Sequence, residues 1–179
     1  MIETERLILR PPSAADRTGL HAMWADPVVM ADLGPVKSAD ESDAAIARHA
    51  GYGESHGLGF LAVEHRDEKL LIGFCGLKPG AEDTPIAGEV EIGWMLAPSW
   101  WGKGYAREAA SASLDWAWAN LEAPRVVAIT AASNERSQAL MVRLGMRRLG
   151  AEFDHPAFDE RDSRRRSVVF AIDRPDTAR

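Results

Sequence analysis

Two glycines, Gly102 and Gly104, stand immediately before a segment with helical spacing, and Lys103 lies between them. The first backbone N–H groups of a helix have no partner within the helix, and the helix dipole is positive at that end. Glycines allow an anion to approach the backbone closely, and the lysine adds a positive charge. The segment Gly102–Ala106 therefore predicts a site for a phosphate-bearing ligand.

The elements that must position this loop lie on either side of it. Residues 89–96 alternate between apolar side chains and charged or small ones, which is typical of a β-strand. Pro98 ends the strand because it has no N–H to donate. From Ala106 to Leu121, small and apolar residues recur at helical spacing. The unit is therefore a strand, a glycine loop and a helix.

Three types of phosphate-binding loop can be compared with this segment. A Walker A loop needs Ser or Thr after its lysine, whereas Gly104 follows Lys103. A Rossmann fingerprint needs a third small residue, and Arg107 stands at that position. The third type fits better: Trp101–Ala106 resembles the Gln/Arg-x-x-Gly-x-Gly/Ala loop of the GNAT superfamily of N-acetyltransferases. The two small residues are in register, but Trp101 replaces Gln/Arg at the first position.

A second motif further along the chain adds to this resemblance. Asn134, Ser137 and Gly145 resemble the second half of the GNAT signature, where the Asn and Ser lie beside the pantetheine arm and the glycine ends the helix. The form of the glycine loop, and the opening segment Glu3–Arg10, resemble the RimJ/RimL-like branch, which is related to ribosomal-protein alanine acetyltransferases. The resemblance covers most of the chain and is strongest between residues 91 and 145.

The resemblance implies a mixed α/β (α+β) fold built on one twisted, mostly antiparallel sheet. About six or seven strands and about four flanking helices are expected. The strands near residues 89–96 and 125–132 should pair in parallel, because a helix connects them, and the resemblance implies that this pair splays apart. One N-acetyltransferase domain should span residues 1–179, with a frayed tail at 175–179.

The rest of the chain is expected to complete the sheet and its covering helices. Ser38 with Glu41 predicts a capped helix, and Gly51, Gly53 and Gly57 are expected to break it. The remaining strands are predicted at residues 4–10, 60–65, 69–77, 147–153 and 166–172.

The ligand that the resemblance implies is acetyl-CoA, used as a co-substrate without a metal. The residues expected to bind it are Met95, Leu96, Trp101, Gly102, Lys103, Gly104, Tyr105, Ala106, Asn134, Ser137 and Met141. A neutral amine would attack the thioester directly, in a ternary complex. A backbone N–H near Met95 and Leu96 would then stabilise the developing oxyanion, so that positioning supplies much of the catalysis.

Glu91 is the candidate general base, because it projects from the central strand close to the predicted acetyl position. An α-amine has a pKa of about 7.7–8.0 and a lysine amine one of about 10.4, so an α-amine makes only a modest demand on a base and water can suffice. Glu89 faces the same way and is the rival. Both residues could also be ordinary solvent-facing acids of a strand.

The leaving thiolate needs a proton or a hydrogen bond, and many GNAT members use a tyrosine for this. The only tyrosines here are Tyr52 and Tyr105, and Phe170 stands where the RimJ/RimL-like branch often has one. Ser137 is therefore the substitute candidate, and a simple polar contact to the coenzyme is its alternative role. Cys75 could act as an acyl-cysteine nucleophile, but its apolar neighbours favour a buried structural residue.

Composition excludes several classes of function. The net charge of −6 argues against nucleic-acid binding driven by overall charge. The single cysteine cannot form an internal disulfide, and no apolar run reaches the roughly 18 residues of a membrane span, so a cytoplasmic protein is expected. The five histidines show no paired metal-ligand spacing.

The expected partner is an amine acceptor, either a protein N-terminus or a small-molecule amine, and the chain is expected to be a monomer or a homodimer. A noncatalytic acyl-CoA-binding sensor of the same fold is the alternative, and a nucleotide-binding regulatory domain of another fold is a third. The arginines within residues 161–166 either form a solvated surface or bind an acidic acceptor or the coenzyme's 3′-phosphate.

Overall fold

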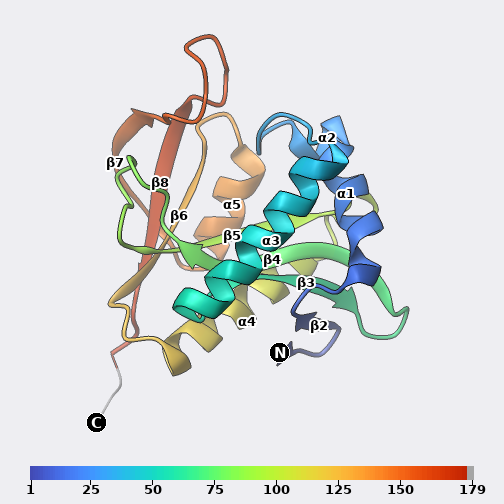
Figure 1. The fold of residues 1–179 in the computed structure, drawn as a ribbon. Coiled ribbons are helices and arrows are strands. Elements are labelled where there is room, and N and C mark those ends of the chain that lie inside the picture. The colour runs from blue at the N-terminus through green and yellow to red at the C-terminus, as the bar shows by residue number, and fades with distance from the viewer. Residues whose placement is uncertain (177–179) are drawn as a thin grey trace.

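The computed structural model describes residues 1–176, so most of the tail predicted at 175–179 lies outside the described residues. The chain forms one sheet in the order β1-β2-β3-β4-β5-β6-β8-β7 (Figure 1). The strands are β1 (Ile2–Glu3), β2 (Leu7–Arg10), β3 (Gly59–His65), β4 (Leu70–Pro79), β5 (Val90–Leu96), β6 (Arg125–Ala131), β7 (Arg147–Asp154) and β8 (Arg166–Asp173). Only β5 and β6 pair in parallel among the described strands. The predicted mixed fold is thus confirmed.

The opening strand differs from its prediction, because residues 4–10 do not form one continuous strand. The Thr4 N–H donates to the carbonyl oxygen of Leu7 (3.0 Å), which closes a turn. Ile2–Glu3 therefore folds back and pairs with β2 as a short strand of its own. This turn accounts for a sheet of eight strands.

Helices cover both faces of the sheet. They are α1 (Arg17–Ala25), α2 (Pro27–Met30), α3 (Ala39–His56), α4 (Tyr105–Asn120) and α5 (Glu135–Arg143), with short 3-10 helices at Ala14–Asp16 and Pro98–Trp100. Side chains of α4 and α5 pack into one apolar core with β2, β4, β5 and β6. Side chains of α1, α2 and α3 pack into a second core on the opposite face, with Phe74 and Met95. The sheet is therefore the middle layer of three.

α3 starts as predicted but ends later. Ser38 and Glu41 form the capping box, with the Ser38 N–H donating to the Glu41 carboxylate (2.7 Å). The prediction that Gly51 and Gly53 break the helix is wrong: the helix continues to His56 and ends at Gly57, whose φ is 67°. A glycine costs a helix interior only about 1 kcal/mol, which tertiary packing can offset. Here the ring of His49 stacks on Phe60 (4.4 Å between centroids) and holds this part of α3 against the sheet.

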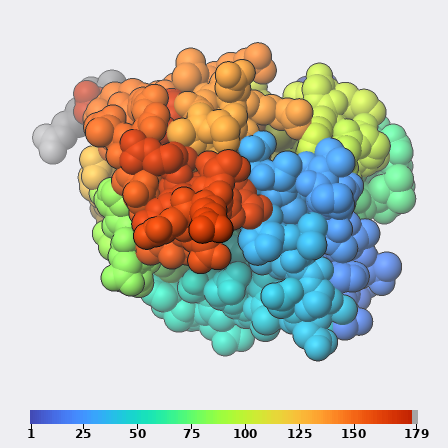
Figure 2. All heavy atoms as spheres, turned by 90° about the horizontal axis from the view of Figure 1, so that it is seen from above, coloured from blue at the N-terminus to red at the C-terminus, as the bar shows by residue number. Residues whose placement is uncertain are grey.

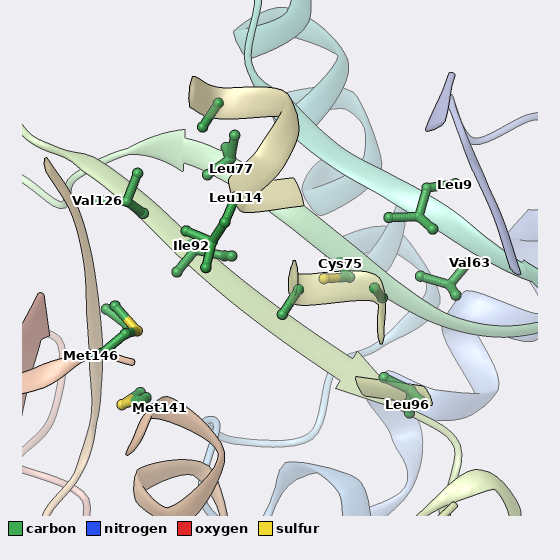
Figure 3. Packing of buried hydrophobic residues seen from close by; sticks show 14 of the residues in the cluster. Leu9, Val63, Cys75, Leu77, Ile92, Leu96, Leu114, Val126, Met141 and Met146 are labelled. Atoms are coloured by element: carbon green, nitrogen blue, oxygen red, sulfur yellow. The ribbon is translucent and has the colours of Figure 1, made fainter. Parts of the chain in front are cut away.

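The core on the α4 face fixes the position of β5. Ile92 of β5 points into it beside Leu114 of α4, Leu96 lies further along the same strand, and Met141 of α5 belongs to the same core (Figure 3). Burying each such side chain stabilises the fold by roughly 1.5–3 kcal/mol. Met95, which alternates with these residues, packs into the core on the opposite face.

The parallel pair is splayed, as predicted. β5 and β6 are in register only at Val90 with Val126 and at Glu91 with Val127. β5 nevertheless continues to pair with β4 as far as Leu96. From Ile92 onward, one edge of β5 therefore faces a gap between the two strands, and the candidate site lies at this gap.

Candidate active site

Two cavities meet at the splayed end of β5. The loop cavity, about 800 Å³, lies over Gly102, Gly104 and the start of α4. The Glu91 cavity, about 450 Å³, lies under α1, α2 and α3. The residues that line both are Asp32, Leu33, Trp94, Met95 and Ser137. A ligand in one cavity can therefore contact a ligand in the other.

The glycine loop has the geometry expected of an anion site. Gly102 and Gly104 have φ of 73° and 86°, a conformation in which other residues are strained. Gly104 precedes the first residue of α4, so the N–H groups of Tyr105 and Ala106 belong to the helix start and lack partners within it. Both residues line the loop cavity.

The loop is held by the turn that connects β1 and β2. The Arg6 guanidinium donates to the Lys103 carbonyl (3.1 Å) and to the Glu108 carboxylate (2.7 Å). Glu108 also accepts from the Arg6 N–H (2.9 Å) and the Thr4 hydroxyl (2.6 Å). Burial alone would raise the pKa of Glu108, but these hydrogen bonds lower it below its ordinary value, so the carboxylate stays ionised. We call Thr4, Arg6 and Glu108 the loop clamp.

Trp101, where the loop departs from the Gln/Arg of the GNAT pattern, connects three elements. Its indole N–H donates to the Leu96 carbonyl at the end of β5 (2.8 Å). The guanidinium of Arg136, from α5, lies 4.2 Å from a ring centroid of Trp101, a cation–π contact. The tryptophan thus ties the loop to β5 and to α5.

The positive charge of the loop cavity comes from residues that the sequence analysis did not select. Arg107, Arg136 and Arg143 line it, whereas the Lys103 ammonium lies over the Trp100 ring, 5.1 Å from the centroid. Arg107 could have been found, because a cation in the first turn of a helix is unfavourable unless an anion binds there. The arginines within 161–166 do not line either cavity; Arg164 pairs with Asp162, and Arg165 and Arg166 pair with Asp154.

The free edge of β5 presents backbone donors to the junction of the cavities. The Ala97 N–H donates to the Ile72 carbonyl of β4 (2.9 Å). Backbone groups alternate in direction along a strand, so the N–H groups of Trp94 and Leu96 point to the splayed side, and that of Met95 points to β4. Met95 lines the junction with its side chain instead.

Glu91 and Glu89, which the sequence could not separate, have different surroundings. Glu91 lines the Glu91 cavity, its side chain is only 12% exposed, and it forms an ion pair with Lys78. Burial raises the pKa of Glu91 above its ordinary value, although the Lys78 ammonium opposes this shift. Glu89 pairs with Arg125 and does not line either cavity. The structure therefore favours Glu91 as the carboxylate that can meet a substrate.

Asn134 and Ser137 stand at the start of α5. The Asn134 side-chain oxygen accepts from the Ser137 N–H (3.0 Å) and caps the helix. Asn134 lines the loop cavity, and Ser137 lines both cavities. Met141, one turn further on, lines only the Glu91 cavity. Ser137 thus supplies a hydroxyl group where the two cavities meet.

Cys75 does not have the surroundings of a nucleophile. It is fully buried in the core on the α4 face, and burial raises the pKa of its thiol to about 12. The reactive form of a cysteine is the thiolate, which this environment suppresses. An acyl-cysteine mechanism is therefore disfavoured.

Segments far apart in the sequence close the Glu91 cavity from above. Met30, Asp32, Leu33 and Lys37 come from one segment, and His155, Ala157 and Phe158 come from the connection between β7 and β8. Figure 2 shows these two segments, blue and orange-red, next to each other on one face of the molecule.

Within residues 1–176, no group of three or more His, Cys, Asp or Glu side chains could hold a metal ion. No helix in that same range is long and apolar enough to cross a bilayer.

The family is shown by comparison with known proteins. Residues 6–147 match the model of the acetyltransferase (GNAT) domain, which is more than half of the chain. The chain therefore belongs to the GNAT acetyltransferase family and is an acyltransferase with the GNAT fold.

Individual relatives agree with this assignment. The chain is 32% identical, over 150 residues, to the uncharacterized N-acetyltransferase YnaD of Bacillus subtilis, covering 83% of this chain and 84% of that protein. An acetyltransferase from Agrobacterium tumefaciens has a similar structure, with a TM-score of 0.78, 27% identity, and 96% and 92% of the two chains covered. A spermidine N-acetyltransferase from Vibrio cholerae, solved with CoA and spermine, has a TM-score of 0.76 at 22% identity, with 96% and 97% covered. That last likeness concerns the fold alone.

Proposed function

We propose that this protein is an acetyl-CoA-dependent N-acetyltransferase that transfers the acetyl group to a primary amine by direct attack in a ternary complex. The observation that carries the proposal is the junction of the two cavities at the splayed edge of β5. One cavity has a helix N-terminus and three arginines suited to phosphates, and the other has a buried carboxylate suited to an amine. We also propose that residues 1–179 form a single N-acetyltransferase domain and that the protein is cytoplasmic.

The loop cavity fits the coenzyme by the chemistry of its donors. The N–H groups of residues 102–106 would hold the pyrophosphate. Arg107, Arg136 and Arg143 would neutralise the phosphates, including the 3′-phosphate. The free edge of β5 would pair with the amides of the pantetheine arm, and Asn134 would lie beside it. Met141 lines the other cavity, so we propose that it contacts the acetyl group or the acceptor rather than the arm.

The remaining residues would act on the amine and on the leaving group. Acetyl-CoA supplies an activated acyl group in the form of a thioester. Glu91, with its raised pKa, takes the proton that the attacking amine must lose. An N–H of Trp94 or Leu96 donates to the acyl oxygen as charge develops on it. Ser137 donates a hydrogen bond to the departing sulfur, which replaces the tyrosine that many GNAT members use.

Two classes of amine acceptor are compatible with this function. The loop variant resembles the RimJ/RimL-like branch, which supports a protein N-terminus, and the Glu91 cavity, about 450 Å³ in volume, supports a small-molecule amine. The charges that line this cavity favour a small-molecule amine with a carboxylate.

Calorimetric titration with acetyl-CoA tests the proposal. Wild-type protein should bind, and Gly104→Glu should not, because its carboxylate would stand in the anion site. Gly88→Glu is the matched control: Gly88 has φ of 80°, is exposed, and a Cβ there would meet no atom within 4 Å. Absence of wild-type binding up to about 1 mM would overturn the proposal. Binding without release of free thiol in the presence of any amine would support a noncatalytic acyl-CoA sensor instead.

A further inference from the structure

The residues that line the Glu91 cavity indicate which acceptor it binds, and this inference rests on the proposed function. Much of its wall is aromatic. The rings that line it belong to Trp24, Phe60, Phe74, Trp94 and Phe158. The Phe74 ring contacts both the Trp24 ring and the Phe60 ring edge to face, with 5.5 Å between the centroids in each pair. A cavity of about 450 Å³ is in the usual range for small-molecule sites, and this wall favours an apolar or aromatic group.

The charges that line the cavity are not suited to a polycation. Lys78 is paired with Glu91, which leaves Lys37 and Arg48 as cations and Asp32 as the one further carboxylate among the described lining residues. The two lining histidines add no charge at neutral pH. Burial lowers the pKa of His49 to about 3, and that of His155 below its ordinary value. A polyamine in this cavity would place several positive charges beside a lining that is itself net positive.

Among the charged residues that line the Glu91 cavity, Asp32 alone also lines the loop cavity. Asp32 lines both cavities, so it lies at the junction where the acetyl group would be presented. Lys37 and Arg48 line only the Glu91 cavity, as do Glu91 and its partner Lys78. The Lys37 N–H donates to the Trp24 carbonyl (2.9 Å), which holds the backbone of Lys37 beside α1, and Arg48 precedes His49 in α3. The cavity thus offers Asp32, at the junction, to an ammonium group and two cations to an anion.

We propose that the acceptor is a free amino acid, or an amine of the same chemistry, with an apolar or aromatic side chain. Its amine lies at the junction, near Asp32, Glu91 and Ser137. Its carboxylate is bound by Arg48 and Lys37, and its side chain packs against the aromatic wall. This acceptor differs from a polyamine, which lacks the carboxylate, and from a protein N-terminus, whose α-carboxyl group is an amide.

Three acceptors of matched chemistry test this assignment: L-phenylalanine, L-phenylalaninamide and spermidine. Turnover is followed by the release of the CoA thiol. The amide keeps the side chain and the α-amine but has no carboxylate. Its amine is also less basic, so a larger fraction is neutral and ready to attack. A preference for phenylalanine therefore cannot come from the amine. We expect kcat/KM for phenylalanine to exceed that for the amide by about 10-fold or more, the size expected for a charge-assisted contact.

Two variants test whether Arg48 and Lys37 bind the carboxylate of the acceptor. Arg48→Met and Lys37→Met should each lower kcat/KM for phenylalanine about 10-fold and leave that for the amide unchanged. Arg17→Met is the control, because Arg17 is exposed, pairs with Asp43 and does not line either cavity. It should change neither value.

The possible failures are distinguishable. Equal or faster turnover of the amide or of spermidine would overturn the assignment and leave the acetyltransferase function intact. Absence of turnover with all three acceptors, in protein that binds acetyl-CoA by calorimetry, would overturn the assignment as well. Absence of acetyl-CoA binding would instead overturn the proposed function itself.

Discussion

Substitution of Arg6 by Met tests whether the loop clamp positions the glycine loop. The substitution removes the guanidinium that donates to the Lys103 carbonyl and to Glu108, and it leaves the aliphatic part of the side chain largely in place. The Glu108 side chain is only 17% exposed, so its carboxylate loses a charged partner that water replaces incompletely. The clamp joins residues that are 102 positions apart in the sequence, and the same guanidinium reaches the loop at the Lys103 carbonyl.

The size of the effect follows from the geometry. A hydrogen bond to a charged group contributes about 1.5–3 kcal/mol net. The Arg6 side chain is 40% exposed, so solvent screening reduces this value. We expect the free energy of unfolding to fall by about 2 kcal/mol, which for a chain of this size lowers Tm by about 4–8 °C. The Kd for acetyl-CoA should rise about 3- to 10-fold, because a loop that is less ordered must be ordered on binding.

The assays are urea unfolding and calorimetric titration with acetyl-CoA, with Arg147→Met as the control. Arg147 pairs with Asp173 across β7 and β8, both side chains about 60% exposed, and removal of such a pair should cost at most about 0.5 kcal/mol. If Arg6→Met and Arg147→Met lose the same stability, the clamp contributes no more than a surface ion pair. If stability falls but the acetyl-CoA affinity does not change, the clamp supports the fold and does not position the loop.

Three further predictions concern acidity, catalysis and packing. The Asp16 carboxylate accepts from Arg10 (2.7 and 2.9 Å), and its pKa is lowered to about 2, below the value of about 3.9 for an unfolded chain. The ionised Asp16 carboxylate therefore stabilises the fold above about pH 4, and this stabilisation is lost as the pH falls towards 2. Asp16→Asn should lower the free energy of unfolding by about 2 kcal/mol at pH 7 and by much less at pH 2. Glu91→Gln should keep acetyl-CoA binding and lower kcat/KM about 100-fold; an unchanged acidic limb in its pH–rate profile would exclude Glu91 as the base. A Cβ at Gly73 would lie 2.5 Å from the Met95 carbonyl oxygen. Gly73→Ala should therefore displace β5, destabilise the protein by about 1–3 kcal/mol and weaken coenzyme binding. A variant with the Tm of the wild type would contradict this packing.

Local patterns in the sequence predicted the strand, the glycine loop and the helix, because each depends on residues close together in the chain. The parallel pairing of β5 and β6 followed from the helix that connects them, and their splay followed from the family resemblance. The choice between Glu89 and Glu91 did not follow, since both have the same strand periodicity and differ only in their partners, Arg125 and Lys78. Those partners are set by strand register, which the sequence pattern does not determine.

Contacts between distant residues explain what the sequence analysis missed or called wrongly. The Arg6–Glu108 contact and the stacking of Arg136 on Trp101 depend on the final packing of separate elements. Gly51 and Gly53 were expected to end α3 on propensity alone. The helix passes through both because its buried face, with His49, is held against the sheet.

The sharing of residues between the two cavities has a consequence for how this enzyme can diversify. The walls of the loop cavity come mostly from residues 94–107 and 134–143, and many of the walls of the Glu91 cavity come from α1, α3 and the connection between β7 and β8. Under the proposed function, substitutions in the walls of the Glu91 cavity can change which amine is accepted while coenzyme affinity is preserved. Substitutions at the residues that line both cavities, such as Asp32 and Met95, must satisfy two ligands at once. New acceptor specificities should therefore arise by replacing the cover of the Glu91 cavity, with the β5 junction retained.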